Sequence, residues 1–170
     1  MNKKERTKAF VAYFSKNMPE AKTELNYTNA FELTVAVILS AQCTDKRVNI
    51  ITKNLFRSLP NAEVMAKASI DVIFDLIKSC TYPRNKARYL LAMAKMLLKD
   101  FNAQIPNTLK DLQKLPGVGR KTANVVGSVY FDIPAILEIV FGKSSRLFSL
   151  SNNSSRRFNL PIDACKIKIQ

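Results

Sequence analysis

Lys121 follows a glycine-punctuated turn, in the segment Leu-Pro-Gly-Val-Gly-Arg-Lys that begins at Leu115. Gly117 and Gly119 can adopt positive φ at little cost, so the chain can turn sharply and present backbone N–H groups where the next helix begins. Such donors attract a phosphate. Arg120 and the positive end of the helix dipole favour the free amine of Lys121, which is the form that acts as a nucleophile. The spacing therefore predicts a phosphate-binding turn beside a nucleophilic lysine.

The rest of the sequence predicts the helices that must position this turn. Apolar residues recur at helical spacing in most of the chain, and no segment alternates convincingly as a strand. Asn29 and Thr44 are suited to cap two of the helices. Helices are expected at Lys3–Asn17, Phe31–Gln42, from Thr44 to before Pro60, Ala62–Ala68, Ile70–Lys78, Asn85–Phe101, after Thr108, and at Arg120–Phe131. The predicted fold class is all-α, built from short helices with brief loops.

The charge of the chain indicates a polyanionic partner. Among 170 residues, Lys and Arg number 27 against 13 Asp and Glu, which gives a formal net charge of +14. Such an excess favours nucleic acid, although a basic surface that only maintains solubility is the alternative. No apolar run is long enough to span a bilayer and no signal peptide is evident, so we expect a cytoplasmic monomer without a membrane partner.

The three cysteines, Cys43, Cys80 and Cys165, stand far apart in the sequence. Their spacing fits neither a disulfide framework nor a metal site, so we expect reduced structural thiols and no metal ligands among them. The composition changes after Ile136, because residues 143–157 contain six serines, two asparagines and four basic residues without helical periodicity. Residues 137–170 are therefore expected to form an irregular, poorly ordered tail.

Three segments together resemble endonuclease III, the helix-hairpin-helix DNA glycosylase and abasic-site lyase of base-excision repair. They are Leu-Ser-Ala-Gln-Cys-Thr-Asp at residues 39–45, Asn-Lys-Ala at residues 85–87, and the hairpin at residues 115–124. The hairpin alone would support only a DNA-binding module. The resemblance implies a helical barrel with an N-terminal helix in residues 1–20, a glycosylase domain in residues 21–136, and a divergent tail from residue 137. It also implies double-stranded DNA with damaged pyrimidines or abasic sites as the partner, and association with the nucleoid if the source is bacterial.

The resemblance also implies a role for each residue of the hairpin. Lys121 would attack C1′ of the damaged nucleotide, expel an oxidised pyrimidine, and hold the sugar as a Schiff base whose β-elimination nicks the strand. Gly117, Val118 and Gly119 would bind the DNA backbone through their N–H groups, with Arg120 beside them. Plain helix connection is the alternative for the glycines, and phosphate pairing is the alternative for the lysine.

Two further segments would open the duplex if the resemblance holds. Gln42 is similar to the family residue that enters the duplex and fills the space left by the flipped base. The loop from Tyr82 to Asn85 is similar to the second wedge, which separates the bases that flank the lesion. The alternative for Gln42 is a solvated helix C-terminus.

The sequence departs from the family pattern after Pro134-Ala135-Ile136. Ile139 stands where the family has the aspartate that assists the lysine, and the neighbouring Glu138 would point about 100° away on a helix. The family's four-cysteine cluster pattern is absent, so no iron-sulfur cluster is expected. A frameshift or an altered gene end would explain so abrupt a change. We therefore expect an impaired bifunctional glycosylase and lyase, with a non-catalytic DNA-binding remnant or an unstable truncated product as alternatives.

Overall fold

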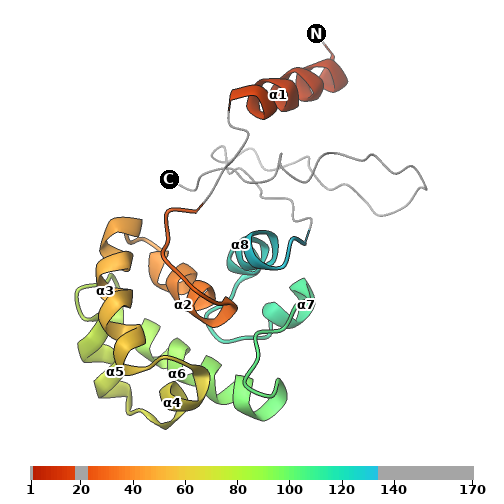
Figure 1. Ribbon diagram of the computed structural model, residues 1–170. Coiled ribbons are helices and arrows are strands. Elements are labelled where there is room, and N and C mark those ends of the chain that lie inside the picture. Colours follow the sequence, from red (N-terminus) through yellow and green to blue (C-terminus); the bar gives the residue numbers. More distant parts are fainter. Residues whose placement is uncertain (1, 18–22, 134–170) are drawn as a thin grey trace.

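The computed structural model describes residues 2–17 and 23–133, and within these ranges it contains eight helices and no strand. The helices are α1 (Lys3–Asn17), α2 (Ala30–Ser40), α3 (Asp45–Ser58), α4 (Ala62–Lys67), α5 (Ile70–Ile77), α6 (Pro83–Asp100), α7 (Leu109–Leu112) and α8 (Arg120–Tyr130) (Figure 1). The all-α prediction is confirmed for the described residues. The tail from residue 137, which includes Glu138 and Ile139, lies outside them.

Most of these helices begin at a residue whose side chain accepts a hydrogen bond from the first turn. Asn29 Oδ1 accepts from the backbone N–H of Glu32 at 2.9 Å, and Thr44 Oγ1 accepts from that of Arg47 at 3.4 Å. Both predicted caps are therefore confirmed. Asn61, Ser69 and Thr108 cap α4, α5 and α7 in the same way. α6 and α8 have no side-chain cap.

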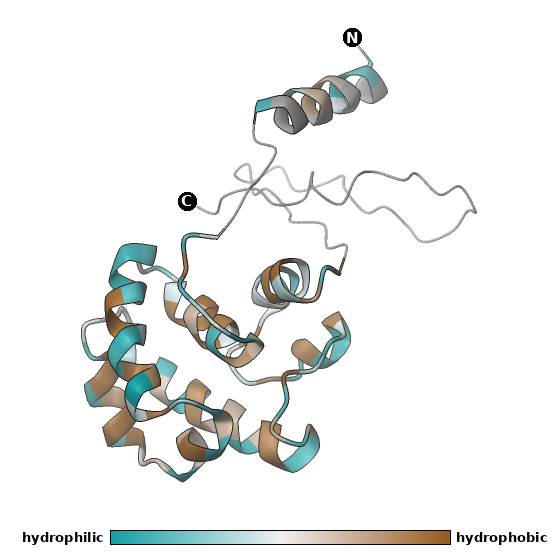
Figure 2. Cartoon of the chain, viewed as in Figure 1, coloured by the Kyte–Doolittle hydropathy of each residue, from teal (hydrophilic) through white to brown (hydrophobic). Residues whose placement is uncertain are grey.

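The core forms around α2, which packs against α3, α6 and α8. α2 is hydrophobic along most of its length, whereas α3 carries hydrophilic residues on its outer side (Figure 2). α6 packs against α4 and α5, and α7 packs against α8. The largest side chains that are almost completely buried are Leu33, Leu39, Leu55, Met65, Ile73, Ile77, Leu90, Met93, Leu97, Leu112 and Leu115. This apolar interior fixes the ends of α2, α6 and α8 relative to one another.

The structure changes two predicted boundaries. α2 ends at Ser40, and Gln42 lies beyond it with a left-handed φ of 56°. α6 begins earlier than predicted, at Pro83, so residues 83–85 form a helical turn in place of the expected loop. Proline is favoured in the first turn of a helix because the N–H it lacks would have no intrahelical partner there. Both differences lie at segments for which a DNA-opening role was predicted.

Candidate nucleic-acid interface

Two apolar side chains anchor the hairpin between α7 and α8. Leu115 and Val118 are buried, and the N–H of Val118 donates to the carbonyl of Leu115 at 3.0 Å, which closes the turn. This N–H therefore already has a partner. The amides of Gly117, of Gly119 and of the first turn of α8 are therefore the hairpin donors suited to bind a phosphate.

Gly117 allows the hairpin to lie close to the two central helices. Its φ is +82°, and a Cβ at this position would be 2.9 Å from Tyr89 Cβ on α6 and 3.5 Å from Ile38 Cδ1 on α2. Since only glycine adopts this conformation without strain and also leaves this space free, Gly117 sets the position of the turn against α2 and α6. The hairpin is thus packed against α2, which ends just before Gln42, and against α6, which begins just after Tyr82.

The N-terminus of α8 faces solvent. Gly119 occupies the N-cap position without a side chain to accept from the first turn, and a Cβ built on it would meet no atom within 4 Å. Arg120 and Lys121, the first two residues of α8, have exposed side chains. Backbone N–H donors, a partial positive charge and two cationic side chains therefore meet in one open place. This combination is suited to bind a phosphate group.

Gln42 and Tyr82 are exposed residues in strained backbone conformations. Their φ values are 56° and 52°, and the side chain of Tyr82 is 65% exposed. A left-handed conformation costs a non-glycine residue about 1–2 kcal/mol, and such strain persists where surrounding contacts fix it. The hydroxyl of Thr81 supplies one such contact, because it donates to the carbonyl of Gln42 at 2.8 Å. The structure thus brings together the two segments predicted to open the duplex.

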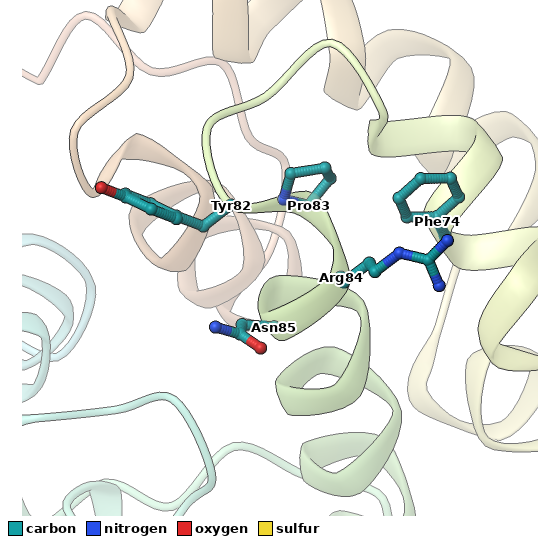
Figure 3. A pocket seen from close by; sticks show the side chains of 5 residues that line it. All are labelled: Phe74, Tyr82, Pro83, Arg84 and Asn85. Carbon is teal, nitrogen blue, oxygen red and sulfur yellow. The ribbon is translucent and has the colours of Figure 1, made fainter.

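The first turn of α6 directs its side chains to two sides (Figure 3). Tyr82 and Asn85 extend to one side, and Arg84 extends to the other, toward Phe74. The guanidinium carbon of Arg84 lies 5.0 Å from the centre of the Phe74 ring, which is a cation–π distance. These residues and Pro83 line an open pocket. Arg84 therefore stabilises the start of α6, whereas Tyr82 and Asn85 remain available to a ligand.

No individual role was predicted for Lys86, although it belongs to the segment Asn-Lys-Ala at residues 85–87. Its side chain is only 6% exposed, and its Nζ donates to the carbonyls of Leu39 and Ala41, both at 2.8 Å. The signal in the sequence was its place on the apolar stripe of α6, one residue before the buried Ala87 and four before Leu90. A lysine on a buried stripe needs polar partners, and here they come from the end of α2.

Two cysteines lie near the same junction. Cys80 is buried, and its thiol donates to the carbonyl of Leu39 at 3.3 Å. Partial burial raises the pKa of the Cys43 thiol, and a hydrogen bond with Cys80 raises it further. Both are free thiols. Within the described ranges, no three His, Cys, Asp or Glu side chains lie close enough together to hold a metal ion.

Within residues 2–17 and 23–133, no helix has the length and apolar character that a bilayer crossing requires.

Comparisons with known proteins identify relatives over most of the chain. The family model described as HhH-GPD superfamily base excision DNA repair protein matches residues 35–155. Endonuclease III of Rickettsia felis is 44% identical over 143 residues, which are 83% of this chain and 67% of that protein. Endonuclease III of Bacillus subtilis is 48% identical over 118 residues, 69% of this chain and 54% of that protein. The chain thus spans between about half and two thirds of the length of these relatives.

A solved structure has a similar fold. It is a trapped covalent intermediate of an endonuclease III with DNA, in a complex with an estranged adenine. The TM-score is 0.76 at 42% sequence identity, and the match covers 80% of this chain and 64% of the other. A non-covalent endonuclease III–DNA complex matches with the same TM-score at 41% identity.

Proposed function

Because the chain belongs to the HhH-GPD superfamily of base excision DNA repair proteins, we propose that it binds damaged duplex DNA and acts on it as a DNA glycosylase and abasic-site lyase. The observation that carries this proposal is the exposed Lys121 in the first turn of α8, directly after an N-cap that has no side chain. A phosphate bound by the amides of Gly117, Gly119 and this first turn would place the adjoining sugar beside the amine.

Lys121 supplies the nucleophile in the proposed reaction. At a pre-existing abasic site, its amine nitrogen bonds to C1′ of the open-chain aldehyde, and water leaves as the imine forms. Loss of a proton from C2′ then expels the 3′ phosphate by β-elimination and nicks the strand. At a damaged base, the same nitrogen bonds to C1′ while the glycosidic bond breaks and the base leaves with a proton. Arg120, next to the lysine, would pair with a phosphate of the same strand.

Gln42, Tyr82 and Asn85 open the duplex in this proposal. Gln42 and Tyr82 project from adjoining segments that Thr81 joins, and both are exposed. A base can react at C1′ only after it leaves the stack, so a polar side chain must fill the gap and an aromatic one must part the neighbouring bases. Gln42 is suited to the first task and Tyr82 to the second. Asn85 extends to the same side as Tyr82 and can bind the exposed strand (Figure 3).

The two steps differ in how much they depend on a carboxylate. Excision must stabilise a cationic sugar, and the position that the family fills with aspartate is Ile139 in this sequence. Loss of a stabilising group of this kind costs about 100–1000-fold in rate. Imine formation with a free aldehyde does not require that the glycosidic bond be broken first. We therefore infer that the lyase reaction is the stronger activity of this chain.

The residues of this sequence do not fit a four-iron cluster. Such a cluster takes four cysteine thiolates, and the sequence contains three cysteines. Two of them, Cys43 and Cys80, lie at the junction of α2 and α6, and the buried Cys80 already bonds to a backbone carbonyl. We propose that the reaction uses no cofactor, and that the protein acts in the cytoplasm, where it would meet DNA.

Borohydride trapping on abasic duplex DNA tests this function. We expect the unmodified protein to form a covalent adduct, because borohydride reduces the imine to a stable amine. Lys121→Ala removes the nucleophile and should abolish the adduct, whereas Lys110→Ala, an exposed lysine on α7, should retain it. Trapping that survives in Lys121→Ala would show that another amine reacts. Duplex binding without any trapping by the unmodified protein would favour a non-catalytic DNA-binding module.

A further inference from the structure

Lys86 joins the two segments that carry Gln42 and Tyr82. Besides the two carbonyls at the end of α2, its Nζ lies 3.2 Å from Cys80 Sγ and 3.3 Å from Thr81 Oγ1. An ammonium group has three N–H donors, and four acceptors surround this one. One side chain from α6 is therefore bonded to both segments at their closest approach.

Lys86 bonds to the C-terminal end of α2, whose own last turn contains no basic residue. The last carbonyls of any helix have no N–H donor within that helix, so those of α2 need partners from elsewhere in the chain. Lys86 places positive charge at the negative end of the helix dipole, where a cation is stabilising. The cost of burying this lysine is thereby offset by carbonyls that themselves need a partner. The hydrogen bonds from Lys86 to the carbonyls of Leu39 and Ala41 thus fix the end of α2 relative to α6.

A chain of contacts leads from Lys86 to the strained residues. Thr81 Oγ1 lies within hydrogen-bonding distance of Lys86 Nζ, and it donates in turn to the carbonyl of Gln42. Thr81 directly precedes Tyr82, and Ala41 directly precedes Gln42. The left-handed conformations at Gln42 and Tyr82 therefore each follow a residue that Lys86 contacts. Strain of this kind is retained where neighbouring bonds leave no relaxed alternative.

We propose that Lys86 is a positioning residue that holds Gln42 and Tyr82 as a single duplex-opening unit. This inference rests on the proposed function and adds to it a buried residue that touches neither DNA nor the reacting atoms. Its effect is specific to paired DNA, because an abasic site in a single strand has no stack to be opened. The chemistry at Lys121 is independent of it.

The test compares trapping on duplex DNA with trapping on single-stranded DNA that carries the same abasic site. Lys86→Met keeps the length of the side chain and removes its donors, and Lys95→Met is the matched control on an exposed position of α6. We expect Lys86→Met to slow trapping on the duplex about tenfold or more, which corresponds to one lost hydrogen bond to a charged group. Trapping on the single strand should stay unchanged, as should both rates in Lys95→Met.

A second variant, at an exposed residue, makes the test less dependent on the stability of the fold. A second measurement makes it independent of catalysis. Thr81→Val removes the exposed hydroxyl that bonds to Gln42, and it should produce the same duplex-specific loss in smaller measure. Fluorescence of 2-aminopurine placed opposite an abasic-site analogue reports base unstacking without any reaction. The rise in this fluorescence on binding should be smaller in Lys86→Met than in the unmodified protein.

The outcomes separate this inference from the proposed function. An equal loss on both DNAs in Lys86→Met would assign Lys86 to stability alone and overturn the inference, as would no loss on either. If the unmodified protein traps neither DNA, the lyase proposal fails, and the fluorescence decides the role of Lys86. An unchanged fluorescence rise in Lys86→Met, or no rise with the unmodified protein, would then overturn it.

Discussion

Alanine substitutions at Gly117 and Gly119 distinguish the effect of the hairpin on stability from its effect on DNA binding. At Gly117, the backbone has φ +82°, and the new Cβ would lie 2.9 Å from Tyr89 Cβ and 3.3 Å from its Cγ. The left-handed conformation costs about 1–2 kcal/mol in a residue with a Cβ. Tyr89 Cβ is fixed to the backbone of α6 and cannot swing away, so the overpacking adds about 1–3 kcal/mol. Gly117→Ala should therefore lower the free energy of unfolding by roughly 2–5 kcal/mol.

Gly119 offers the contrasting case two residues later. Its φ of −83° is open to any residue, and a Cβ would meet no protein atom within 4 Å. Alanine is a poorer N-cap than glycine, so Gly119→Ala should cost no more than about 1 kcal/mol of stability. The added methyl group would however lie in the open space at the start of α8, where the phosphate is proposed to bind. Loss of one hydrogen bond to a charged group weakens binding about tenfold or more.

Urea unfolding and titration with a short abasic duplex, measured on both variants, check this reasoning. Gly117→Ala should show the larger loss of stability, and Gly119→Ala should show weakened binding at nearly unchanged stability. Binding by Gly119→Ala that equals that of the unmodified protein would mean that no phosphate approaches the start of α8. Unchanged stability in Gly117→Ala would mean that the close contact with Tyr89 is absent in solution.

Three further predictions concern charge. Because phosphate contacts release counterions, the logarithm of the duplex association constant should fall linearly with the logarithm of salt concentration, and a flat response would refute DNA binding through phosphates. The hydrogen bond from Lys114 lowers the pKa of the exposed Asp111 carboxyl, and burial raises that of Asp45. In an NMR titration, Asp111 should therefore protonate below the usual pH range of an aspartate and Asp45 above it. As the pH falls, protonation of Asp111 lowers the stability of the fold and protonation of Asp45 raises it. Burial raises the pKa of the Cys43 thiol, so iodoacetamide at pH 8 should modify it more slowly than an exposed thiol, as peptide mass spectrometry would show.

The sequence predicted the helices well because their signals are local. Asn29 and Thr44 cap where expected, since a capping side chain bonds to an N–H only three residues ahead. The predicted end of α2 was two residues too late, because the contacts that end this helix are not local. Its apolar pattern extends toward Gln42, but the carbonyls of Leu39 and Ala41 bond to Lys86, which lies more than forty positions along the chain. No local pattern records such a partner.

The candidate site shows the same division. The hairpin and the place of Lys121 in the first turn of the next helix followed from two glycines and a helix start, all within seven residues. The resemblance implied that the N–H of Val118 binds DNA, whereas in the structure this N–H donates to the carbonyl of Leu115 and closes the turn. Gln42 and Tyr82 came from the resemblance and not from the residues themselves. Their left-handed backbones depend on Thr81 and Lys86, which only the folded chain brings together.

Among the described helices, α6 and α8 lack a side-chain cap, and they begin at the two places where DNA is proposed to bind. Gly119 precedes α8, and Tyr82 precedes α6 with its side chain turned outward. A serine or asparagine at position 119 would use its side-chain oxygen to bond the first amides of α8, and those amides would no longer be open to a phosphate. A glycine N-cap costs α8 only a few tenths of a kcal/mol relative to such a residue. This small loss of stability leaves the start of α8 without a capping side chain where a polyanion can bind, while α2–α5 and α7, whose N-cap side chains accept from the first turn, maintain the scaffold.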